Sequence, residues 1–67
     1  MTVLKVRPTN AQLNNLWARV HQTGLQIKYK EERGELLMLV VENLSQAHML
    51  RDIIDSENIR VIYDASF

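Results

Sequence analysis

The chain has no cysteine, only two glycines and one proline among its 67 residues, and 6% aromatic residues. The lack of cysteine excludes disulfides, thiolate metal sites and a cysteine nucleophile. The two glycines are isolated, so no phosphate-cradling loop is present. Eight basic and eight acidic residues balance, so net charge favours neither an anionic nor a cationic partner. A chain of this length predicts one domain, spanning residues 1–67, with a thin margin of stability.

The apolar residues follow two different periods along the chain. Strands are predicted where they occur at every second position or without a break, over residues 2–7, 25–30, 35–42 and 59–64. A first helix is predicted to start at Thr9 or Asn10 and to end before Gly24. A second is predicted to start after Ser45 and to end at Asn58.

The order strand–helix–strand–strand–helix–strand is that of the ferredoxin-like βαββαβ sandwich. We therefore expect an α+β fold in which two helices cover one face of a four-stranded antiparallel sheet. The expected spatial order of the strands is 4-1-3-2. The opposite face of such a sheet stays open, and we expect the working surface there.

The pairing of the second and third strands decides which residues face the helices. A four-residue turn over 31–34 pairs Lys30 with Glu35. The strand residues then expected beneath the helices are Leu4, Val6, Leu25, Ile27, Tyr29, Leu36, Met38, Val40, Ile59, Val61 and Tyr63. Trp17, in the apolar stripe of the first helix, is expected to be buried with them. A turn that differs by one residue would exchange the two sets on the third strand and leave its open face still apolar.

The open face is expected to carry an aliphatic stripe. Its members are Val3, Leu37, Leu39, Val41 and Ile62. Monomers of this size seldom leave such a continuous apolar patch in water. The stripe therefore predicts an interface with a second copy of the chain or with another protein, and Leu39→Asp is expected to give a monomer.

Five basic residues are expected around the same stripe. They are Lys5, Arg7, Lys28, Lys30 and Arg60. One interpretation is a contact surface for an anion or for the phosphates of a nucleic acid. The other is that lysines on strand edges prevent edge-to-edge pairing and are simply solvated.

RNA-recognition domains share this order of elements and stack bases on aromatic residues of the open face. The stretch 33–40 begins with Arg33 and Gly34 as their third-strand motif does, but its aromatic positions are aliphatic or acidic. Base stacking is therefore not predicted. Ligand-sensing domains of the same architecture bind near the first strand–helix turn, here residues 7–10. An arginine beside a helix N-terminus suits a carboxylate or phosphate, although ordinary helix capping also explains this turn.

One cluster on the second helix has the spacing of metal ligands. His48, Asp52 and Asp55 lie at i, i+4 and i+7, and residues at i and i+4 can share a metal. A solvated helix face is the favoured interpretation, because no second cluster would complete the site. No nucleophile, acid–base pair or cofactor motif stands elsewhere. We predict no metal, no cofactor and no enzymatic activity.

The expected function is that of a small non-enzymatic protein-interaction or regulatory accessory module, homodimeric through its open face. The alternative is a small-ligand-sensing or nucleic-acid-backbone-binding domain that uses the basic residues of that face. Lys5 and Arg7 interrupt the apolar residues at the start, so neither a signal peptide nor a membrane span is expected. A cytoplasmic location is expected, which the lack of cysteine permits.

Overall fold

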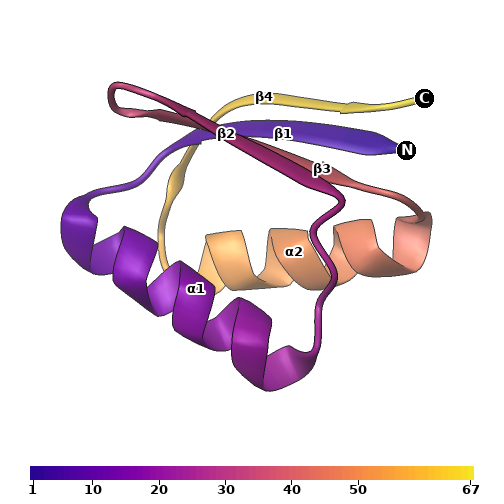
Figure 1. The fold of residues 1–67 in the computed structure, drawn as a ribbon, viewed down its shortest axis with the longest axis horizontal. Helices are drawn as coiled ribbons and strands as arrows, with labels where there is room; N and C mark the ends of the chain where they lie inside the picture. Colours follow the sequence, from indigo (N-terminus) through magenta and orange to yellow (C-terminus); the bar gives the residue numbers. More distant parts are fainter.

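The computed structural model describes all 67 residues and contains six elements in the predicted order. They are β1 (Thr2–Arg7), α1 (Asn10–Thr23), β2 (Tyr29–Arg33), β3 (Leu36–Val41), α2 (Leu44–Ser56) and β4 (Arg60–Ser66). The strands form one antiparallel sheet in the order β2-β3-β1-β4. Both helices lie on one side of this sheet and leave the other side uncovered (Figure 1). The predicted ferredoxin-like α+β fold and its strand order are confirmed.

Helix α1 begins and ends at the residues that the sequence indicates. The Thr9 hydroxyl accepts a hydrogen bond from the Gln12 amide at 3.2 Å, and the Gln12 side chain accepts one from the Thr9 amide at 2.9 Å. This reciprocal capping box satisfies two amides that the first turn leaves unpaired. At the other end Gly24 takes a φ of 73°, the left-handed conformation that closes a helix and that glycine adopts without strain.

Helix α2 begins two residues earlier than predicted. Its N-cap is Asn43, whose side chain accepts a hydrogen bond from the Gln46 amide at 3.0 Å, and not Ser45. Asparagine and serine cap helices about equally well, so the pattern could not choose between two positions so close together. Asn58, predicted to close this helix, follows the C-cap residue Glu57 and takes a φ of 54°.

The hydrophobic core lies between the helices and the sheet. Its buried members are Leu4, Val6, Leu16, Leu25, Leu37, Leu39, Val41, Ala47, Leu50, Ile53, Ile54 and Ile59. None of them comes from β2, whose five residues are all exposed or half-buried. Trp17 packs against the core but is half-buried, so the prediction of a buried Trp17 is wrong. The Lys30 ammonium lies 4.6 Å from the centre of its ring.

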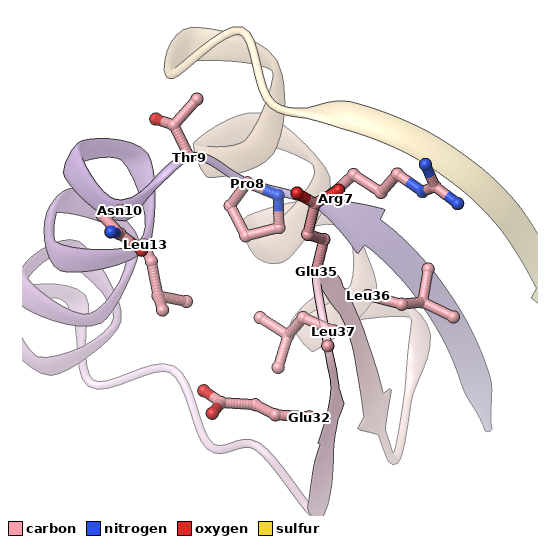
Figure 2. A pocket seen from close by; sticks show the side chains of 10 residues that line it. Arg7, Pro8, Thr9, Asn10, Leu13, Glu32, Glu35, Leu36 and Leu37 are labelled. Carbon is pink, nitrogen blue, oxygen red and sulfur yellow. The ribbon is translucent and has the colours of Figure 1, made fainter.

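The residues of β3 that face the helices are those that were predicted to lie on the open face of the sheet. Leu37, Leu39 and Val41 are at most 2% exposed and belong to the core. Figure 2 shows Leu37 on the side of α1 and Leu36 on the other side of the sheet. Assigning Leu37, Leu39 and Val41 to an open aliphatic stripe was therefore wrong.

This exchange of the two faces of β3 originates in the segment before β2. Leu25 and Ile27 contact the core as predicted, but residues 25–28 are not part of a strand. Because this irregular segment breaks the alternation, Tyr29 lies on the opposite face from Ile27. The hairpin closes later than predicted, through a two-residue turn at Gly34 and Glu35, and Tyr29 pairs with Val40 instead of Leu36.

Candidate interaction surface: the open face and the β4 edge

The open face of the sheet is formed by alternate residues of all four strands. Leu4 and Val6 are buried beneath the sheet, so their neighbours on β1 face away from the helices. Residues paired across strands share a face, so the ladders define the complete set: Val3, Lys5, Arg7, Tyr29, Glu31, Arg33, Leu36, Met38, Val40, Arg60, Tyr63 and Ala65. Of the predicted aliphatic stripe only Val3 is in this set. Ile62 is 46% exposed and lies where the β1–β4 ladder is irregular.

Two tyrosines that were predicted to lie beneath the helices occupy this face instead. Tyr29 is 50% exposed and Tyr63 is 43% exposed. Tyr63 faces outwards because the β1–β4 ladder shifts register between Lys5 and Val6, so Tyr63 and Val61 do not share a face. An inserted residue of this kind leaves no trace in the alternation of apolar residues. Sequence reasoning therefore missed both aromatic rings of the open face.

Each tyrosine contacts a charged neighbour. The Lys5 ammonium lies 5.3 Å from the centre of the Tyr63 ring, within the range of a cation–π contact. The Tyr29 hydroxyl donates a hydrogen bond of 3.2 Å to the Glu31 carboxylate. This hydrogen bond, together with the negative charge of Glu31, raises the pKa of Tyr29. The open face thus combines aromatic rings with charges at both of its sides.

The structure divides the predicted basic set. Lys5, Arg7 and Arg60 lie together on the open face, and Arg7 is the direct cross-strand partner of Arg60. Lys28 and Lys30 do not join them. The Lys28 ammonium lies 3.9 Å from the Glu42 carboxylate, and Lys30 is held against α1.

The two edge strands of the sheet differ in chemistry. β2 reads Tyr-Lys-Glu-Glu-Arg, and charged side chains on an edge oppose pairing with another strand. β4 contains neither lysine nor proline, and Val61, Ile62 and Tyr63 are each 43–46% exposed. Phe67, immediately after β4, is 81% exposed. Two charged residues, Arg60 and Asp64, remain on β4, and Asp64 is paired with Arg51, so this edge is less protected than that of β2, where four of five residues are charged.

The backbone of β4 also presents unused hydrogen-bonding groups. Met1 and Phe67 exchange two hydrogen bonds, of 2.7 and 3.2 Å. Bonded and non-bonded pairs alternate along an antiparallel ladder, so the N–H and C=O groups of Asp64 and Ser66 point away from β1. Because β4 is the last strand of the sheet, these groups have no partner strand.

Side chains on the helix side hold this part of β4 in place. Arg51 donates to both carboxylate oxygens of Asp64, at 2.9 and 2.7 Å, and to the Ser66 hydroxyl at 3.3 Å. The bidentate bond is the main reason why the pKa of Asp64 is lowered and that of Arg51 is raised. The Ser66 and Thr2 hydroxyls are 2.9 Å apart. Asp64 to Ser66 therefore form an anchored, regular strand end.

The first strand–helix turn borders a hollow of about 490 Å³ (Figure 2). The guanidinium of Arg7, the expected anion ligand, points away from α1 in this view. The charged residues that remain along the lining are Glu32 and Glu35, which would repel a carboxylate or phosphate. The turn therefore does not assemble the anion site that was considered for it.

The cluster on α2 and the helices themselves were also candidates for function. His48, Asp52 and Asp55 are exposed, and no three His, Asp or Glu side chains are close enough together to hold a metal ion. Neither α1 nor α2 combines the length and apolar character that a membrane-crossing helix requires. The features that stand out are thus the open face and the β4 edge. No protein-family model, curated protein or solved structure matches this chain.

Proposed function

We propose that the chain is a non-enzymatic protein-interaction module that associates with a second copy of itself through the edge of β4. The observation that carries this proposal is the contrast between the two edges of the sheet. The β2 edge is charged, whereas the β4 edge exposes apolar side chains beside unpaired backbone groups. An edge of the second kind is a template for strand pairing.

The open face is unsuited to self-association. A two-fold dimer places the same patch of both copies in contact. Face-to-face packing with the axis near Lys5, Arg7 and Arg60 would bring these cations of the two copies together. Such like-charge contacts are unfavourable, and more so when water is excluded. The expected dimer through the sheet face is therefore replaced by a dimer through the sheet edge.

One register of two β4 strands is self-complementary. A two-fold axis at Ala65 pairs Asp64 with Ser66 of the partner subunit, so the outward N–H and C=O groups of both residues exchange hydrogen bonds. The same register puts Tyr63 opposite Phe67 of the partner subunit, and aromatic cross-strand pairs contribute about 0.2–1 kcal/mol each. An axis at Asp64 would instead place that carboxylate opposite its own copy, which is unfavourable.

Proline substitutions at the two edges test this proposal. Ser66→Pro removes one outward N–H without breaking a bond to β1, and we expect it to abolish dimerisation. Glu32→Pro is the matched control, because by the same alternation its N–H points away from β3. Ser66→Ala controls for the lost hydroxyl. Sedimentation equilibrium should show dimers for the parent, Glu32→Pro and Ser66→Ala, and monomers for Ser66→Pro.

A strictly monomeric parent, or a Ser66→Pro variant that still dimerises, would refute self-association through β4. Circular dichroism melting of each variant establishes that it is folded before its mass is compared. Loss of the dimer in Glu32→Pro alone would move the interface to the opposite edge of the sheet.

A further inference from the structure

Three cations of the open face have no carboxylate partner. Of the eight lysines and arginines, those at positions 19, 28, 33 and 51 form ion pairs with carboxylates. Lys30 lies against the Trp17 ring on the helix side. The three that remain, Lys5, Arg7 and Arg60, all lie on the open face.

Arg7 and Arg60 form a pair of like charges that a bound anion would stabilise. They are direct partners in the antiparallel β1–β4 ladder, and like charges in that position destabilise a strand pair. No acidic side chain forms an ion pair with either guanidinium. A phosphate bound between them would remove the repulsion, because each guanidinium can donate two parallel hydrogen bonds to phosphate oxygens.

Aromatic rings lie beside these cations. Lys5, two residues from Arg7 on β1, contacts the exposed Tyr63 ring, and Tyr29 is exposed at the opposite side of the face. Tyr29 is the direct partner of Val40, whereas Lys5 lies between Tyr63 and Met38. Proteins bind a single strand with cations that contact its phosphates and aromatic rings on which its bases stack, and this surface has both. In a duplex the bases are stacked on one another, so their flat faces are not available to such a surface.

We propose that the open face binds single-stranded nucleic acid, with phosphates at Lys5, Arg7 and Arg60 and a base on Tyr63. The inference does not depend on the dimer. If β4 does pair with its copy around an axis at Ala65, the two open faces lie side by side on one continuous sheet. A longer strand could then contact both.

The test measures the fluorescence anisotropy of a labelled oligothymidylate in low salt. The double variant Arg7→Gln/Arg60→Gln should bind about 10-fold more weakly or worse, because two phosphate contacts are lost. Lys28→Gln/Lys30→Gln removes the same charge away from the open face and should bind like the parent. The log–log salt slope of the first variant should be smaller than that of the parent by about 1.4, the share of two phosphates on a single strand.

A second pair of variants tests the ring. Tyr63→Leu should weaken binding by about 10-fold, whereas Tyr63→Phe, which keeps the ring, should bind like the parent. The melting temperature of Arg7→Gln/Arg60→Gln should equal or exceed that of the parent, since a repulsive pair has been removed. This readout separates loss of the site from loss of the fold.

Three outcomes would overturn the proposal. One is the absence of oligothymidylate binding in low salt, and another is an equal loss of affinity in both double variants. The third is displacement of the oligonucleotide by polyglutamate at matched charge concentration as effectively as by unlabelled oligonucleotide. The open face would then be a general surface for acidic proteins.

Discussion

Arg51 links helix α2 to the end of β4 through the Asp64 carboxylate. The two side chains are 32% and 35% exposed, so water screens the pair in part. Its bidentate geometry and the additional bond to Ser66 still make it the most elaborate ion pair of the molecule. We therefore expect a measurable effect on stability.

Asp64→Asn should lower the free energy of unfolding at neutral pH by about 0.5–1 kcal/mol, as removal of a partly exposed pair does. The pKa of Asp64 is lowered in the folded chain. The contribution of Asp64 to the free energy of unfolding is therefore complete above the ordinary carboxyl pKa. It is lost as the pH falls through the lowered pKa of the folded state. Urea denaturation at a series of pH values should show the two proteins converging in acid. A difference that persists in strong acid would contradict this assignment.

Leu39 exemplifies how the structure changes an expectation at the scale of one residue. It is 0% exposed, so Leu39→Asp should prevent folding and not merely give a monomer. Leu39→Ala should cost about 2–5 kcal/mol, as the loss of a buried leucine side chain does. Met38 is half-buried on the open face, so Met38→Ala should lower the free energy of unfolding clearly less. Equal losses in denaturant titrations of the two alanine variants would contradict this orientation of β3, and a larger loss in Met38→Ala would reverse it.

At the scale of elements, the β2–β3 hairpin depends on Gly34. This residue takes a φ of 59° at the first position of the two-residue turn, where a side chain is unfavourable. Gly34→Ala should lower the free energy of unfolding by about 1 kcal/mol. Glu35→Ala, at the second position, should have a much smaller effect. Similar losses in thermal melts of the two variants would contradict this account of the turn.

The elements were predictable where a local signal exists. Thr9 and Gly24 mark the ends of α1, and the change of period marks the order of all six elements. The orientation of β3 had no such signal, because residues 36–41 are apolar without a break and fit either face. It depended on how β3 pairs with β2, and the irregular segment 25–28 before β2 interrupts the alternation.

The candidate site was accessible to sequence reasoning only in part. Lys5, Arg7 and Arg60 were placed on the open face correctly, since β1 alternates clearly and β4 follows its partner. Tyr63 was misplaced, because a register shift in a single ladder is a tertiary feature. The β4 edge is a candidate surface because β4 is the last strand of the sheet. This position follows from the strand order and not from the alternation of apolar residues along the chain.

At the scale of the whole molecule, a chain of zero net charge separates its charges in space. The unpaired cations gather on the uncovered side of the sheet, whereas Asp52 and Asp55 lie on α2 below it. The proposed self-association uses the backbone edge of β4, whereas the proposed nucleic-acid binding uses the cations of the open face, and only Tyr63 takes part in both. Each can be disrupted without the other, by Ser66→Pro and by Arg7→Gln/Arg60→Gln respectively.

Amide hydrogen exchange, followed residue by residue at increasing protein concentration, tests whether β4 pairs with a second copy of itself. The N–H groups of Asp64 and Ser66 point away from β1, and those of Lys30 and Glu32 point away from β3. Pairing of β4 with its copy should slow the exchange of Asp64 and Ser66 as the concentration rises, while Lys30 and Glu32 remain unchanged. If all four amides exchange at rates independent of concentration, β4 does not pair and the claim is contradicted.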